Sequence, residues 1–143
     1  MAKRFAKIGV EASANKVISC ENANDKDCEN SEGVFEESIG QAFMESISGW
    51  PANLWIYSPD SGRGHLANID DDWDAAQDIF IAQQPFPSWV LDTATGQWDA
   101  PIPEPALTPE EIAAGKNYGW DEALYESDNT KGFVLYQSGD NWN

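Results

Sequence analysis

The sequence contains few of the residues that most metal sites and many active sites need. His65 is the only histidine, and Cys20 and Cys28 are the only cysteines among 143 residues. A disulfide framework needs more cysteines, and a zinc site needs a second Cys pair or a His cluster. Both thiols are therefore expected to be reduced, with one local disulfide between them as the open alternative.

Catalytic motifs are missing as well. The sequence has no nucleophile elbow, phosphate-binding loop or dinucleotide fingerprint, and one histidine rules out most hydrolase schemes. Its 25 acidic residues always offer carboxylate pairs, but no spacing singles one pair out for glycoside hydrolysis. The sequence therefore predicts a protein that is not an enzyme and that uses no cofactor.

Basic residues are scarce. Eight Lys and Arg stand against 25 Asp and Glu, which gives a formal net charge of −17. Tight binding to nucleic acid or to an anionic membrane needs clustered cations, so neither partner is expected. Lys3, Arg4 and Lys7 lie within the first seven positions. They form a candidate docking segment for an anionic partner, and a solvated tail is the alternative.

Long apolar runs are also lacking, so no transmembrane span is expected, and no apolar core follows the basic start as it would in a signal peptide. Hydrophobic residues still make up 41% of the chain and aromatics 12%, which is enough for a folded core. We expect a small α+β lobe over residues 1–70 and a β-hairpin lobe over 71–143, with one shared core as the alternative.

The first lobe has alternating strand and helix signals. Apolar stretches at residues 5–8 and 17–20 predict a hairpin with its turn near Ala14 and Asn15. The polar segment 21–32 is predicted to be a loop, and residues 54–57 a strand.

One helix is predicted in this lobe, over residues 34–48. Its apolar positions recur every four residues, and Gly49 and Pro51 end it. Gly40 inside the helix costs about 1 kcal/mol relative to alanine. The apolar positions are Phe35, Ile39, Phe43 and Ile47.

The second lobe contains a weak repeat of an aspartate followed by an aromatic residue, which is typical of short hairpins. Copies span residues 73–80 and 89–98, and a third joins Trp120 to a strand at 133–136 through a longer tip over 126–131. Gly96 is expected at a positive φ angle, so that Gly96→Val would cost on the order of 1–2 kcal/mol. The fold class is thus α+β and predominantly β, with short antiparallel strands.

A proline-rich connector at residues 101–109 separates the second hairpin from the third. Thr108 and Glu111 form a capping box, and Pro109 occupies the first helical position. A short helix over residues 109–114 should end at Gly115.

Two further groups of side chains are candidates for binding. Aspartates between Asp70 and Asp78 are spaced like the start of a calcium loop, but Ala75 and Ile81 replace its Gly and its Glu, so no metal site is predicted. A set of aromatic residues could either form a sugar-stacking platform or pack in the core. That set is Trp73, Trp89, Trp98, Trp120 and Tyr136.

The block Gln84–Pro103, with its Pro-Ser-Trp-x-Leu-Asp and Gly-x-Trp-x-Ala-Pro-x-Pro pattern, resembles small structural proteins of marine cyanophages and related tailed phages. Weaker similarities extend over most of the chain, while residues 49–68 and the last hairpin depart from the pattern. The similar segments are Phe5–Ile8, Asn15–Ile18, Gly40–Phe43, Trp73–Ile81 and Trp120–Glu122.

The resemblance implies a virion component, assembled in the cytoplasm of the host bacterium, whose partners are phage capsid or tail proteins. A capsid decoration protein is the first expectation, and a tail, fibre or baseplate subunit the second. A carbohydrate-binding module for a host-surface glycan is the alternative outside this class, and homo-oligomerisation stays open. Attachment is expected through the surface around Trp89 and Trp98, the segment with Lys3, Arg4 and Lys7, or both.

Overall fold

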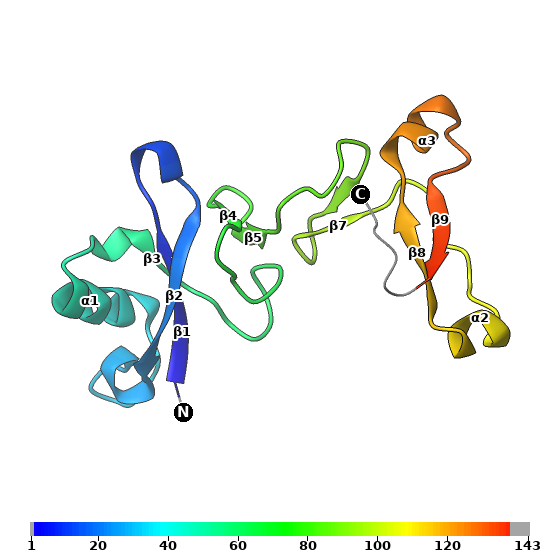
Figure 1. Cartoon of the computed structure of the whole chain (residues 1–143). Coiled ribbons are helices and arrows are strands. Elements are labelled where there is room, and N and C mark those ends of the chain that lie inside the picture. The colour runs from blue at the N-terminus through cyan, green and yellow to red at the C-terminus, as the bar shows by residue number, and fades with distance from the viewer. Residues whose placement is uncertain (1, 138–143) are drawn as a thin grey trace. The chain divides into compact units, whose positions relative to one another are not determined.

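The computed structural model describes residues 2–137, which divide into two compact units (Figure 1). Unit 1 contains the chain up to Gln83 together with Leu91–Gln97, and unit 2 contains Gln84–Val90 together with the chain from Trp98 onward. This division differs from the predicted boundary at residue 70. The hairpin that follows residue 70 supplies core residues to unit 1, so it belongs there.

The α+β, predominantly β fold class is confirmed, with short antiparallel strands and hairpins accompanied by short helices. Each unit combines strands and helices. The elements are β1 (Ala2–Ile8), η1 (Glu11–Ser13), β2 (Val17–Asn24), η2 (Asp25–Cys28), α1 (Glu37–Ser48), η3 (Ala52–Leu54), β3 (Trp55–Tyr57), β4 (Asp72–Asp74), β5 (Ile79–Ile81), β6 (Val90–Asp92), β7 (Gln97–Asp99), α2 (Pro109–Ala113), β8 (Lys116–Trp120), α3 (Glu122–Ser127) and β9 (Phe133–Gln137).

Unit 1 is built on a three-stranded antiparallel sheet in the order β2-β1-β3. The predicted opening hairpin is confirmed, since β1 pairs with β2 through a connection that contains Asn15 at a φ of 64°. β1 is the central strand, and it buries side chains on both faces: Phe5 toward one side and Ala6 and Ile8 toward the other.

The prediction of a loop over residues 21–32 was partly wrong. β2 continues to Asn24, because Asn22 and Asn24 pair with β1 opposite Arg4 and Ala2. The pairing partner overrides the low intrinsic strand propensity of asparagine. A single turn of 3-10 helix then places Cys28 in the core.

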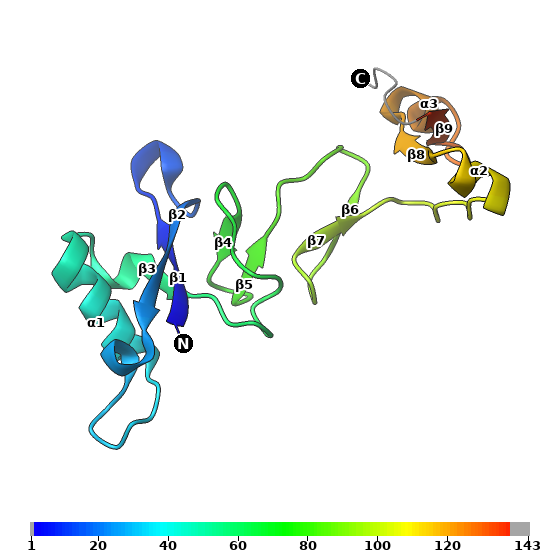
Figure 2. The same ribbon diagram turned by 60° about the horizontal axis from the view of Figure 1, so that its bottom comes forward.

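α1 covers one face of this sheet (Figures 1 and 2). The helix was predicted, and it begins three residues later than expected, after Glu36 in an extended conformation. The helix ends at Gly49, as predicted, and this glycine adopts the left-handed conformation with a φ of 75°. The core of this layer consists of Phe5, Ala23, Cys28, Met44 and Trp55.

Gly40 lies where α1 approaches the sheet most closely. A Cβ at this position would overlap the Phe5 ring and lie 3.1 Å from Cys28 Sγ. The glycine therefore lets the helix backbone approach the central strand, and this offsets its low helix propensity.

We expect Gly40→Ala to destabilise unit 1 in a thermal melt. Overpacking costs about 1–3 kcal/mol, which exceeds the gain of about 1 kcal/mol in helix propensity. Ser38→Ala is the matched control, because Ser38 is exposed on the same helix. The control should leave the melting temperature level or slightly raised, and a rise for Gly40→Ala would contradict the close approach.

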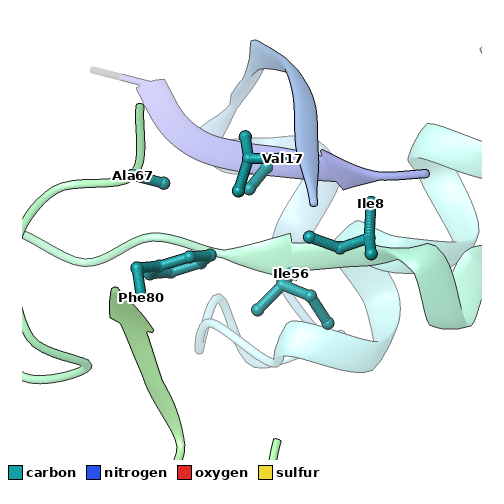
Figure 3. Packing of buried hydrophobic residues seen from close by; sticks show 6 residues of the cluster. Ile8, Val17, Ile56, Ala67 and Phe80 are labelled. Carbon is teal, nitrogen blue, oxygen red and sulfur yellow. The ribbon is translucent and has the colours of Figure 1, made fainter. Parts of the chain in front are cut away.

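The opposite face of the sheet packs against the β4–β5 hairpin and the segment before it. Phe80 of β5 is fully buried and points toward Ile56 and Val17 (Figure 3). Trp73 of β4 packs against Phe80 with ring centroids 4.7 Å apart and the rings tilted by 44°. This hairpin was predicted. Because it packs into the core of unit 1, unit 1 extends to Gln83 and does not end at residue 70.

The β6–β7 turn has the predicted chemistry. The Asp92 carbonyl accepts hydrogen bonds from the amides of Thr95 and Gly96, and Gly96 has a positive φ of 69°, as predicted. The turn also belongs to unit 1, since Ala82 N donates to Gly96 O at 2.8 Å. A Cβ on Gly96 would overlap Phe80 O.

In unit 2 the predicted capping box is present, with Thr108 and Glu111 bonding each other's backbone amides at the start of α2. The third hairpin is also confirmed, because β8 pairs with β9 and Trp120 lies opposite Phe133. The connection between β8 and β9 contains an additional helix, α3, which follows its N-cap residue Asp121 and lies mostly before the predicted tip at 126–131. None of the helices within residues 2–137 has the length and apolarity needed to cross a membrane.

Candidate docking surface

The five predicted docking residues belong to different units. Lys3, Arg4 and Lys7 lie on β1 of unit 1, whereas Trp89 and Trp98 lie in unit 2.

The solvated-tail alternative for the basic residues is wrong, because residues 2–8 form the central strand of a sheet. The Lys7 ammonium lies 4.7 Å from the centre of the Trp50 ring and 5.8 Å from that of Trp55. Arg4 donates to the Ala67 carbonyl from Nε and Nη2, at 3.1 and 2.7 Å. These cations contribute to the packing of unit 1.

Lys3 has a similar intramolecular role. Its Nζ lies 3.6 Å from an Asp25 carboxylate oxygen and 5.4 Å from the centre of the Phe35 ring. Neutralising the three basic residues would therefore change the stability of unit 1 as well as its charge. The aromatic pair in unit 2 is the better candidate for a docking surface.

Trp89 belongs to an aromatic cluster around Trp120, which is only 6% exposed. The Trp89 and Trp120 rings meet edge to face at 5.8 Å, and the Phe133 ring lies 5.0 Å from Trp120 at a similar angle. Phe86 and Tyr125 extend the cluster. Among the candidate platform residues, Trp73 and Trp120 thus pack within their units, as core packing requires.

Glu122 fixes the segment that carries Trp89 to α3. Its Oε1 accepts from the Ser88 hydroxyl at 2.6 Å and from Trp120 Nε1 at 2.9 Å, and its Oε2 accepts from the Ser88 amide at 3.2 Å. The sequence did not predict these hydrogen bonds, because Ser88 and Glu122 are 34 positions apart. The Trp-Asp-Glu sequence at 120–122 was the one available signal.

Trp89 makes no such bond. Its Nε1 is buried without a hydrogen-bond partner in the described part of the chain. A buried donor without an acceptor costs about 1–3 kcal/mol. The ring contacts of Trp89 with Trp120 and Phe86 must offset that cost, so Trp89 is held by packing.

The hydrogen bonds that Glu122 accepts lower its pKa below the ordinary value of 4.5. The Ser88 hydroxyl has the largest effect, and Trp120 Nε1 the next largest. The carboxylate form is favoured in the folded state. Its stabilising contribution is therefore complete above pH 4.5 and is lost as the pH falls through the folded pKa.

We expect the indole N–H resonance of Trp120 to shift as the solution is acidified through the pKa of Glu122, and Glu122→Gln should abolish that titration. Glu126→Gln, an exposed change on the same helix, should preserve it. If the Trp120 resonance still titrates in Glu122→Gln, a group other than Glu122 causes the shift, and the prediction fails.

Two adjoining hollows in unit 2 form the candidate docking surface. The larger has a volume of 510 Å³, and the smaller, which Trp89 and Trp98 line, has a volume of 360 Å³. They share a wall made by Ile102, Pro103 and Phe133. We call the two hollows together the Trp98 groove; their lining includes both predicted docking tryptophans and part of the proline-rich connector.

The aspartates of the acidic segment after residue 69 each contact a different residue. Asp71 bonds to His65, Asp72 forms an ion pair with Lys16, and Asp78 lies 3.2 Å from Arg63 Nε. The Asp74 carboxylate accepts from the Gln77 side chain and amide, and these bonds lower its pKa. Across residues 2–137 no group of three or more His, Cys, Asp or Glu side chains is arranged to hold a metal ion.

Neither His65 nor the cysteines have the surroundings of a reactive group. His65 Nε2 lies 2.8 Å from Asp71 Oδ2 and Nδ1 lies 3.0 Å from the Thr95 carbonyl, so both ring nitrogens face structural acceptors. Cys20 and Cys28 are free thiols, and burial raises the pKa of each. A raised pKa lowers the thiolate fraction and hence the reactivity.

No known protein family, curated protein or solved structure matches this chain. The resemblance to phage structural proteins is therefore carried by the residues quoted above.

Proposed function

We propose that this chain is a non-enzymatic structural protein of a tailed-phage particle, displayed on the capsid surface as a decoration protein. One observation carries the proposal. The block Gln84–Pro103, which bears the resemblance, is also the segment that supplies Trp89, Trp98, Ile102 and Pro103 to the Trp98 groove. The distinctive part of the sequence is thus used to build a surface for docking.

The distribution of charge and apolar area supports attachment through this groove. A body with a net charge of −17 is repelled by other acidic surfaces, and salt screens that repulsion only in part. An aromatic and proline-lined surface can supply affinity by apolar burial instead. The partners would be capsid proteins for a decoration protein, or tail, fibre or baseplate proteins if the chain is a tail subunit instead.

The test is quantitative mass spectrometry of particles purified from cells that produce the chain. We expect the protein to remain with intact particles through density-gradient purification. Hundreds of copies per particle would place it on the shell, whereas a handful would place it on the tail. Its absence from purified particles would contradict a virion role.

A glycan-binding module is the second candidate, because the half-buried Trp98 lines an open groove to which it could offer an aromatic face. Quenching of tryptophan fluorescence by added host polysaccharide, in the absence of any particle, would favour this function. A lack of quenching together with particle association would exclude it.

A further inference from the structure

The two ends of the Trp98 groove differ in character. The larger hollow is mainly apolar, with Pro105 and Leu124 added to the shared wall, and residues 129–131 form its polar rim. The smaller hollow combines Trp89 and Trp98 with the carboxylates of Asp99 and Glu104. The groove therefore offers an apolar site next to an aromatic and acidic one.

The carboxylates of the smaller hollow are not neutralised by the protein itself. Within residues 2–137 neither Asp99 nor Glu104 has an ion pair or a side-chain hydrogen bond. Lys131, the cation at the larger hollow, lies 3.7 Å from Asp128. No Lys or Arg of the described chain lines the smaller hollow, so a ligand there meets uncompensated negative charge.

We infer that the Trp98 groove binds an extended basic segment of a partner protein, with an apolar side chain in the larger hollow and an adjacent Lys or Arg in the smaller one. The carboxylates attract the cation, and the two tryptophans that line this hollow favour it over a neutral group wherever it meets a ring face. An anionic ligand would be repelled at this end. The inference rests on the proposed function, since it defines the chemistry of the surface that a virion component would offer to its neighbour.

The exposed position of the carboxylates limits their contribution. Exposed ion pairs contribute little to affinity, so apolar burial must supply most of it while the charges select the partner. Binding should consequently weaken with salt and should discriminate strongly between basic and acidic peptides of the same apolar content.

The experiment selects binders from an mRNA-displayed library of random octapeptides on the immobilised full-length chain. Recovered peptides should be enriched in Lys or Arg next to an apolar residue. They should bind the Asp99→Asn/Glu104→Gln double variant about tenfold more weakly, which corresponds to about 1.4 kcal/mol. Glu110→Gln/Glu126→Gln is the control, since it removes the same charge from exposed sites outside the groove.

Three outcomes would overturn the inference: no enrichment of basic peptides, equal binding to the double variant, or equal weakening by the control pair. Quenching by a neutral polysaccharide that the double variant loses would identify a glycan site instead. The association of the chain with phage particles is measured in a separate experiment. The proposed virion function can therefore hold even if binding of a basic segment is disproved.

Discussion

Gly96→Ala is expected to lower the melting temperature of unit 1 by several degrees or more. The alanine Cβ would overlap the Phe80 carbonyl oxygen and would lie 2.9 Å from His65 Nδ1. A positive φ adds strain of about 1–3 kcal/mol, and overpacking a filled site costs a similar amount. The structure thus makes this position more sensitive than the turn conformation alone predicts.

Gly62→Ala separates the two causes. Gly62 also has a positive φ, 86°, but a Cβ there would meet nothing within 4 Å. This control carries only the conformational strain, so the extra loss in Gly96→Ala measures the contact with Phe80. Equal losses in the two variants would show that the β6–β7 turn does not dock on β5.

Trp120→Ala is expected to unfold unit 2 while leaving unit 1 folded. Replacing a buried Trp with alanine costs about 3–5 kcal/mol. Within the described part of unit 2, Trp120 and Gly132 are the only buried residues. A two-stranded hairpin is marginal without such packing, so β8 and β9 cannot persist once the ring is removed.

Amide hydrogen exchange distinguishes this outcome from a general loss of stability. In Trp120→Ala the amides of β8 and β9 should lose protection, while those of β1 keep it. Ile112→Ala is the control, because Ile112 is an apolar residue of unit 2 that is 63% exposed. Protection of β8 and β9 that survives the loss of Trp120 would mean that another core holds the hairpin.

Local signals in the sequence predicted most of the elements. Three of these predictions depend only on neighbours in sequence, and all three are confirmed: the Thr108–Glu111 capping box, the end of α1 at Gly49 and the positive φ of Gly96. α3 was missed although Asp121 before Glu-Ala-Leu is a recognisable N-cap, because residues between Asp121 and Phe133 were interpreted only as part of a hairpin with a long tip.

Features that depend on distant contacts could not be predicted. Nothing near Phe80 indicates that its carbonyl receives the β6–β7 turn, and nothing near Ser88 indicates Glu122. The same limit applies to the candidate site. The sequence indicated Trp89 and Trp98 only as candidate docking residues, and Asp99 and Glu104 became candidates only through their position at the hollow that both tryptophans line.

The chain leaves unit 1 at Gln83, returns for Leu91–Gln97 and then leaves again, so the two units are interleaved in sequence. Genetic exchange between related chains is constrained by this arrangement. A crossover near residue 83 would combine Phe80 from one parent with Gly96 from the other. A crossover after Gln97 keeps that contact but separates Ser88 and Trp89 from their partners Glu122 and Trp120. A crossover between Trp89 and Gly96 breaks both sets of contacts, so junctions in viable chimaeras should be rarest there.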